Sequence, residues 1–394
     1  MISRLRFQIP AFTAIRTILN TMHRMVYLFL PHFSRGLGVD VSALSLGLTV
    51  RAFVGIFGPL VASVSDSRGR KLGLLLGLCL FTAGVALVVF WPTYLAFVLA
   101  LVLTTLGKYT FDPTMHAYLG DRVPYQRRGL AVALTEVGWS LSFIVGVPLV
   151  GFIIARGGWM SPFSIFTLLG VASFGLVIWM IPTGSLVKGP PLVVAPTKGA
   201  RVPMWHNFRA VLAYPPALAG LAVALTCSAA NEIINLVLAI WMEDAFGLKI
   251  MALGATAAII GLAELGGESL VGGLVDRLGK PRSVGIGLGL NILAALVFPF
   301  LGRSLAGALV GLILFYITFE FTLVSSIPMM TEVMPSSRAT LMAFFVASLS
   351  LGRALGALLA IPLYNWGIVV SAAAVIAFDI LALLALRPLW RLSS

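Results

Sequence analysis

Charged residues are scarce in this chain of 394 residues, where they make up 10% of the sequence against 59% for hydrophobic residues. Soluble globular domains carry roughly 25% charged residues, so this composition argues against a water-soluble fold. A helix needs about 20 apolar residues to cross the hydrocarbon core of a bilayer, and apolar runs of that length recur along the whole sequence. We therefore predict a protein that crosses the membrane many times.

Cysteine and histidine are also rare. The two cysteines, Cys79 and Cys227, lie inside apolar runs, which excludes a disulfide framework and a cysteine-rich metal site. There are four histidines and no HExxH sequence, and the stretch "LGKYT" at 106–110 lacks the glycine spacing of a phosphate-binding loop. We expect no enzyme activity, no metal and no cofactor. The start, "MISRLRFQIPAF", lacks the features of a removable signal peptide.

Charged and Pro/Gly-rich breaks divide the chain into apolar segments. They predict twelve spans: 10–33, 42–64, 72–91, 93–119, 128–155, 161–182, 214–242, 250–275, 283–302, 305–332, 337–363 and 366–387. Because the number of crossings is even, both termini should lie on the same side of the membrane.

Basic residues outside these spans or at their ends are distributed unevenly, with 18 on the side of the termini and 4 on the other. Loops rich in Lys and Arg stay in the cytoplasm, so we expect a cell (inner) membrane protein with both termini cytoplasmic. The same bias accounts for most of the net charge of +13. A nucleic-acid partner is therefore not expected, although a basic soluble protein would suggest one.

The two halves of the chain resemble each other at an offset of about 210 residues. "DSRGRK" at 66–71 pairs with "DRLGKP" at 276–281, and a second pair of similar segments, 119–134 and 330–345, aligns Arg128 with Arg338. A Pro/Gly-rich stretch at 182–203 separates the halves. A duplicated six-helix unit is typical of secondary transporters. We predict a bundle at 1–183, a cytoplasmic linker at 184–212 and a second bundle at 213–394.

The first charged segment is similar to the signature found between spans two and three in the major facilitator superfamily. It reads Ala62, Asp66, Ser67, Arg68, Gly69, Arg70 and Lys71, and its second copy reads Gly272, Asp276, Arg277, Leu278, Gly279 and Lys280. The first copy departs from the pattern at Ala62 and Ser67. The resemblance implies an all-α membrane fold with twelve transmembrane helices in two pseudo-symmetric six-helix bundles.

The resemblance also implies a conformational latch between the halves. Its residues would be Asp66, Arg70, Asp276, Arg277 and Arg338. A carboxylate at a helix N-terminus is stabilised by roughly 0.3–1 kcal/mol, which gives Asp66 a physical reason to meet the start of span eleven. The alternative is that Arg68, Arg70 and Lys71 only set the topology.

Span five contains "GWSLSFIVGVPLVG" at 138–151, which is similar to a Gly-rich element of the drug/proton antiporter branch. Here Val147 stands between Gly146 and Pro148, and Phe152 replaces the last glycine of the pattern. The element therefore favours an antiporter, but ordinary close packing of helices would explain it equally well.

Seven acids and five bases fall inside the predicted spans. The acids are Asp112, Glu136, Glu232, Glu264, Glu268, Glu320 and Asp379, and the bases are Arg16, Arg24, Arg51, Lys108 and Arg353. Each costs on the order of 2.5–3.5 kcal/mol at a helix centre, so these residues require a shared polar interior.

Acids in such an interior can carry protons, because burial and a neighbouring base shift the pKa of a carboxyl group in opposite directions. The candidates for proton coupling are Asp112, Glu136, Glu320, Glu232 and Glu264. The alternative is fixed ion pairing, of Lys108 with Asp112 or of Arg353 with Glu320. Arg16 could instead extend to the membrane interface, and we expect Asp379 to be structural.

Helical spacing of three and four residues places Arg16, Asn20, His23, Arg24 and Tyr27 on one face of span one, and Lys108, Asp112 and His116 on one face of span four. In the superfamily, spans one, four, seven and ten line the central cavity. The predicted cavity residues are Asn20, His23, Arg24, Tyr27, Lys108, His116, Asn231, Asn235, Tyr316 and Arg353.

The function predicted from these patterns is proton-coupled efflux of small amphipathic compounds by alternating access. The expected partners are the substrate, protons and the lipid bilayer, and the default oligomeric state is a monomer. A symporter or exporter of sugars or organic anions with the same fold is the alternative, because deep bases suit anions whereas buried acids suit cations or protons. A membrane receptor would need neither the repeat nor acids in both halves.

Overall fold

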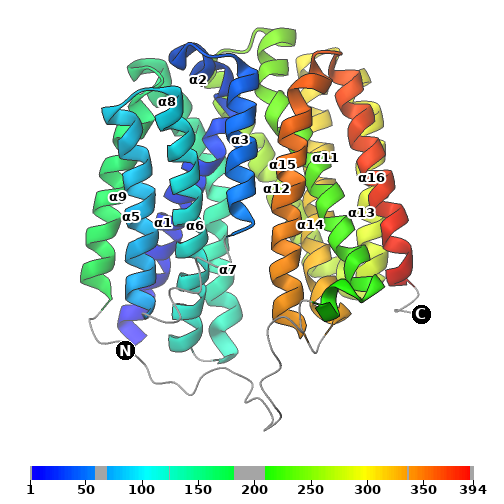
Figure 1. Ribbon diagram of the computed structural model, residues 1–394, viewed down its shortest axis with the longest axis horizontal. Coiled ribbons are helices and arrows are strands. Elements are labelled where there is room, and N and C mark those ends of the chain that lie inside the picture. Colours follow the sequence, from blue (N-terminus) through cyan, green and yellow to red (C-terminus); the bar gives the residue numbers. More distant parts are fainter. Residues whose placement is uncertain (1, 58–68, 124, 182–208, 335–336, 391–394) are drawn as a thin grey trace. The chain divides into compact units, whose positions relative to one another are not determined.

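The structure is a computed structural model that describes residues 2–57, 69–123, 125–181, 209–334 and 337–390. Within these ranges every regular element is helical (Figure 1). Ten of the described helices are long and apolar enough to cross a membrane, or up to eleven spans if one bent pair is counted. This confirms the predicted all-α membrane fold.

The first two predicted spans differ from the other ten. Helix α1 (Ile2–Leu28) has a polar face that includes Arg16, Asn20 and Arg24, and it is not among the ten. It ends at a break at Phe29, and α2 (Leu30–Leu37) follows with Pro31 in its first turn. Helix α3 (Val41–Gly55) is bent by 113° from α2. The second predicted span continues into residues 58–68, outside the described residues.

The chain divides into two compact units, of which the first comprises residues 1–26 and 57–203. Its further elements are α5 (Arg70–Phe90), α6 (Tyr94–Arg122), α7 (Tyr125–Leu141), the π-helix η1 (Ser142–Gly146), α8 (Val147–Gly157) and α9 (Ser161–Met180). Helix α5 packs against both α6 and α9 (Figure 1). Phe12 of α1 meets Phe111 and Tyr118 of α6 edge to face.

The second unit comprises residues 27–56 and 204–394. Its helices after α3 are α11 (Pro215–Phe246), α12 (Ile250–Leu278), α13 (Lys280–Leu301), α14 (Leu305–Val333), α15 (Arg338–Tyr364) and α16 (Ile368–Trp390). Helix α11 packs on α15 and α16, and α13 packs on α14 and α16. Helix α3 joins this unit through α15, where the Ser45 hydroxyl donates to the carbonyl of Ala357 at 2.5 Å.

These units group residues 27–56 with the second half of the chain, which the predicted boundaries do not anticipate. The predicted linker, 184–212, lies mostly outside the described residues. The boundaries of the two repeats therefore stay a prediction.

Equivalent close contacts in the two units support the repeat. A Cβ atom on Gly77 of α5 would lie 2.9 Å from the Cβ of Phe111, and a Cβ atom on Gly287 of α13 would lie 3.1 Å from the Cδ1 of Phe321. The two glycines are 210 residues apart (287 − 77), and so are the two phenylalanines (321 − 111). In each unit, two corresponding helices thus pack closely, with a glycine on one helix against a phenylalanine on the other.

A second pair of glycines is separated by the same number of residues. A Cβ atom on Gly146 would lie 2.0 Å from Oγ1 of Thr21, and one on Gly356 would lie 2.7 Å from the Cβ of Glu232. The glycines are again 210 residues apart (356 − 146). Gly146 closes the π-helix η1, directly before the turn that contains Pro148. Close packing therefore accounts for Gly146 in the Gly-rich element, and membership of the antiporter branch stays a proposal.

Candidate functional site

The polar cluster of the first unit is centred on Arg16, which is 5% exposed. Its Nε lies 3.2 Å from Oδ1 of Asp112 on α6, and its Nη1 lies 2.8 Å from Oε1 of Glu136 on α7. Nη1 also donates to the carbonyl of Thr135 at 2.9 Å. Arg16 therefore links α1 to two other helices, and the expectation that it extends to the membrane interface is wrong. Ion pairs to two acids on different helices hold this side chain in the interior.

Asp112 has a second base on its own helix. The Nζ of Lys108 lies 2.5 Å from Oδ2 of Asp112, which is the ion pair expected from the sequence as the alternative to proton coupling by Asp112. The exposed fraction of the Asp112 side chain is 13%, and that of Lys108 is 9%. Two bases, Arg16 and Lys108, therefore surround one buried acid, an arrangement that favours a lasting ion pair over a proton carrier.

Glu136 has a different environment. Its side chain is 48% exposed, and its Oε1 lies 3.0 Å from Nε2 of His116 as well as 2.8 Å from Arg16. Glu136 and His116 thus form a partly exposed pair that joins α7 to α6, beside the buried pair of Lys108 and Asp112.

Arg24 lies against two aromatic rings about two turns further along α1 than Arg16. Its Cζ is 3.3 Å from the ring centre of Phe143 and 4.3 Å from that of Trp139, and its Nη1 donates to the Trp139 carbonyl at 3.3 Å. A guanidinium over an aromatic face is attracted by the ring quadrupole. The prediction included Arg24 but missed Phe143, although the four-residue spacing of Trp139 and Phe143 places both rings on one helix face.

Asn20 lies between these two groups on α1 and is 1% exposed. Neither its Oδ1 nor its Nδ2 has a hydrogen-bond partner among the described residues. Leaving a buried polar group without a partner costs about 1–3 kcal/mol, so this amide is suited to a ligand or a water molecule. His23, on the same helix, is half-buried.

The polar cluster of the second unit contains Glu232 on α11, which is 2% exposed. Its Oε1 accepts a hydrogen bond from the hydroxyl of Tyr27 at 2.7 Å, and that hydroxyl in turn accepts one from Nη2 of Arg51 at 2.5 Å. Gly356 of α15 packs directly against the Cβ of Glu232 and fixes its position. Arg51 was recognised as a base inside a span but was not assigned to the site, where the structure places it.

Two other predicted cavity residues meet beside Glu232. The hydroxyl of Tyr316 on α14 donates to Oδ1 of Asn235 on α11. Oδ1 of Asn231, one turn away from Asn235, has no hydrogen-bond partner among the described residues. Arg353 of α15 is half-buried, and its Nε lies 3.5 Å from the carbonyl of Leu349.

Glu320 and Glu264 are 6% and 4% exposed. A Cβ atom on Gly267 of α12 would lie 3.0 Å from the Cβ of Glu320, so α12 and α14 pack closely at this level. Their part in proton coupling stays a prediction. Asp379 on α16 is 1% exposed, and its Oδ2 has no hydrogen-bond partner among the described residues.

The predicted latch falls partly outside the described residues. Asp66 and the side chain of Asp276 are not described. Nε of Arg70 lies 3.2 Å from Oδ2 of Asp121, an ion pair between α5 and the end of α6. Arg338 donates to a backbone carbonyl of α14 at 2.7 Å, and Arg277 is exposed. The latch therefore stays a prediction.

Comparison with known proteins adds a family and a fold. Residues 13–357 match the Major Facilitator Superfamily. The uncharacterized MFS-type transporter YwfA of Bacillus subtilis is 27% identical over 342 residues, which cover 85% of this chain and 80% of that protein. Sugar efflux transporter A of Escherichia coli is 25% identical over 341 residues, which cover 85% of this chain and 83% of that protein.

Two solved structures show the same fold at low sequence identity. A bacterial homologue of the human lysosomal transporter Spinster, in an inward-facing and unoccupied conformation, matches with a TM-score of 0.81 at 16% identity, over 98% of both chains. The D-xylose–proton symporter matches with a TM-score of 0.77 at 16% identity, over 97% of this chain and 96% of that one. These likenesses concern the fold, and they confirm the predicted pair of six-helix bundles.

Proposed function

The chain belongs to the Major Facilitator Superfamily and is a secondary transporter, and we propose that it exports small amphipathic compounds in exchange for protons by alternating access. Four of the helices that contribute to the two polar clusters, α1, α6, α11 and α14, are those to which the superfamily assigns the substrate path. The first cluster joins acids to bases directly, and the second joins Glu232 to Arg51 through the Tyr27 hydroxyl, which supports coupled binding of a proton and a substrate.

Glu232 is the observation that carries the proposal of proton coupling. This acid is 2% exposed in the interior of the 32-residue helix α11. A buried charge is costly, and the cost is removed either by a proton or by a base. Tyr27 lies between Glu232 and Arg51, so a small rearrangement could exchange a protonated acid for an ion pair. An acid with these two stable states can couple a proton to a conformational change.

The first unit supports a cargo with both polar and apolar parts. Trp139 and Phe143 present aromatic surface around Arg24, and Asn20 offers a donor and an acceptor without partners among the described residues. Small-molecule sites combine an apolar lining with a few placed polar groups, which is the composition found here. Amphipathic compounds match it.

The test uses purified protein in proteoliposomes that contain a pH-sensitive dye. A panel of amphipathic dyes and antibiotics is added under an imposed pH gradient, and the proposal expects substrate movement accompanied by proton movement in the opposite direction. Glu232→Gln should remove proton movement. Asp40→Asn, the same type of change at an exposed acid at the start of α3, is the matched control. Proton movement at the wild-type rate in Glu232→Gln would reject this role for Glu232.

A second candidate is export of sugars, favoured by two observations. Sugar efflux transporter A is a relative over most of the chain, and the unpartnered amide atoms of Asn20 and Asn231 suit ligands rich in hydroxyl groups. The same proteoliposomes distinguish the two candidates. Proton movement driven by sugars but by none of the amphipathic compounds would replace the first candidate with the second.

We also propose the orientation in which the basic ends of the helices, including Arg122 of α6 and Arg277 of α12, face the cytoplasm. The excess of basic residues on that side of the predicted spans supports it. A reporter enzyme active only in the periplasm, fused after residue 390, should stay inactive. Activity of that fusion would reverse the orientation.

A further inference from the structure

A cavity of about 720 Å³ lies at one end of the second unit, away from the polar cluster around Glu232. Its wall is formed by the start of α11, the junction of α12 and α13, the last turns of α14 and the end of α16. Cavities of roughly 300–1,000 Å³ are the usual size of small-molecule sites. The volume is therefore large enough for a phosphate group together with the atoms attached to it.

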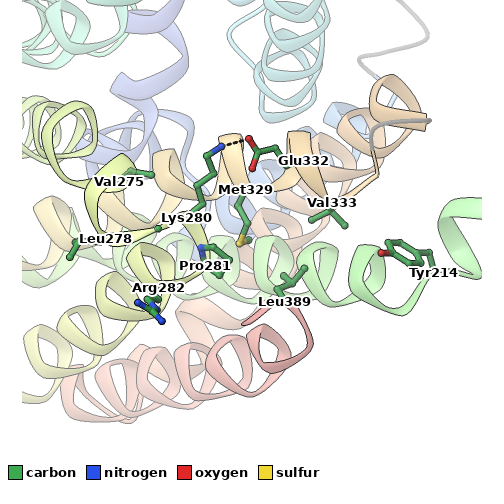
Figure 2. A pocket seen from close by; sticks show the side chains of 11 residues that line it. Tyr214, Val275, Leu278, Lys280, Pro281, Arg282, Met329, Glu332, Val333 and Leu389 are labelled. Atoms are coloured by element: carbon green, nitrogen blue, oxygen red, sulfur yellow. Dashed lines mark hydrogen bonds and ion pairs between the residues drawn. The ribbon is translucent and has the colours of Figure 1, made fainter. Parts of the chain in front are cut away.

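Two basic side chains line this cavity, and one acid opposes them. Lys280 forms an ion pair with Glu332, whereas Arg282 projects away from that pair (Figure 2). Arg282 is exposed and has no carboxylate partner among the side chains that the structure describes. Among the described side chains of the cavity wall, the bases outnumber the acid by two to one, and an anionic ligand would balance them.

The rest of the wall is apolar and includes Leu278, Met329 and Leu389. Outside the cavity, an exposed apolar stripe continues along α13 from Arg282. Ile286, Leu290 and Leu293 follow Arg282 at spacings of four, four and three residues and are 44%, 46% and 56% exposed. Residues at these spacings lie on one face of a helix. A ligand with a charged head and a long apolar tail would match both the cavity and the stripe.

Trp390 places the cavity at the level of the membrane interface. Its indole Nε1 donates to the carbonyl of Pro281 at 3.1 Å, and the side chain is 42% exposed. Tryptophan gathers where lipid headgroups meet the hydrocarbon, because one end of the ring is polar and the rest apolar. We therefore expect the basic side chains of the cavity at headgroup depth, with the apolar stripe of α13 on the membrane side of them.

We infer that this cavity binds the phosphate headgroup of an anionic phospholipid, with the phosphate held by Arg282 and an acyl chain along the stripe of Ile286, Leu290 and Leu293. Basic pockets between the ends of transmembrane helices suit such headgroups. The apolar stripe is the reason to assign the phosphate to a lipid and not to a soluble phosphate ion. Neither Lys280 nor Arg282 belongs to the clusters of the proposed transport site, so this inference does not depend on the proposed cargo.

The experiment measures lipid retention by the delipidated full chain in detergent. Native mass spectrometry counts the lipids that remain bound during titration with dioleoyl phosphatidylglycerol, with dioleoyl phosphatidylcholine as the zwitterionic comparison. We expect Arg282→Gln to weaken retention of phosphatidylglycerol about fivefold, the contribution of one basic residue near a headgroup. Arg303→Gln is the matched control, since Arg303 follows the opposite end of α13, with its Cζ 5.8 Å from the ring of Phe300.

A second variant tests the apolar part without changing charge. Leu290→Gln, at an exposed position of α13, should weaken retention of phosphatidylglycerol while Arg282 is intact. Equal retention in the wild type and in a Lys280→Gln/Arg282→Gln variant would overturn the inference. So would equal retention of phosphatidylcholine, which would indicate unselective lipid contact. Displacement of the lipid by millimolar inorganic phosphate would assign the cavity to a soluble anion instead.

Discussion

The hydroxyl of Tyr27 donates a hydrogen bond of 2.7 Å to a carboxylate oxygen of Glu232, 205 residues away along the chain. Tyr27→Phe removes this donor from a buried acid, which costs about 1–3 kcal/mol. We expect lower thermal stability in detergent and a lower ratio of protons moved per substrate in proteoliposomes. Tyr109→Phe, at a half-buried tyrosine of α6, is the control. A normal ratio of protons to substrate in Tyr27→Phe would exclude Tyr27 from the proposed coupling of protons to transport.

Arg16 and Asp112 should behave as one unit in a double-mutant cycle. Arg16→Gln leaves two acids without their shared base, and Asp112→Asn leaves two bases without their acid. Breaking a buried pair from one side costs about 3–5 kcal/mol. The double variant should be less destabilised than the sum of the single variants, by about 1–3 kcal/mol in the free energy of unfolding in mixed micelles. If the losses of stability in the two single variants add up to that of the double variant, Arg16 and Asp112 have no interaction energy.

The contacts of Gly146 and Gly356 predict matched steric defects in the two units. An alanine methyl at Gly146 would collide with Thr21, and one at Gly356 would collide with α11 at Glu232. We expect each substitution to be destabilising by about 1–3 kcal/mol, because neighbouring helices must move apart. The controls are Gly175→Ala and Gly289→Ala, where the methyl enters open space. A control variant that unfolds at a lower temperature than the Gly146→Ala or Gly356→Ala variant would contradict the close packing at these two glycines.

Arg35 and Glu243 form an ion pair of 2.7 Å between α2 and α11. The side chain of Arg35 is 56% exposed, so the pair adds only about 0–1 kcal/mol to stability. We nevertheless expect Arg35→Glu to slow transport, since two like charges would then repel where residues 27–56 meet α11. The exchanged pair Arg35→Glu/Glu243→Arg should restore the rate. A transport rate that stays low in the exchanged pair would show that the slowing is not caused by repulsion between residues 35 and 243.

Local spacing was enough to predict part of the first cluster. Lys108 and Asp112 are four residues apart on one helix, a distance at which side chains meet whatever the tertiary fold. The stripe of Arg16, Asn20 and Arg24 followed from the same rule. The partners of Arg16 on α6 and α7 could not be predicted, because they depend on how those helices rotate and cross.

The contact between Tyr27 and Glu232 depends on packing between distant segments, and periodicity carries no information about it. The glycine contacts are different, because an offset of 210 residues was visible in the sequence. Asking which glycines recur at that offset would have found Gly146 with Gly356 and Gly77 with Gly287. The basic cavity had no such signal, since its walls come from the ends of five helices.

Helix α1 belongs to both units: its residues up to Val26 fall in the first, and Tyr27 begins the segment that falls in the second. Two residues later the helix breaks at Phe29, and Pro31 supplies no backbone donor to the turn that follows. A break in the helical hydrogen bonds therefore lies three residues after the boundary of the first unit. In the proposed alternating-access cycle, a stiffer chain at this break would slow the change of state.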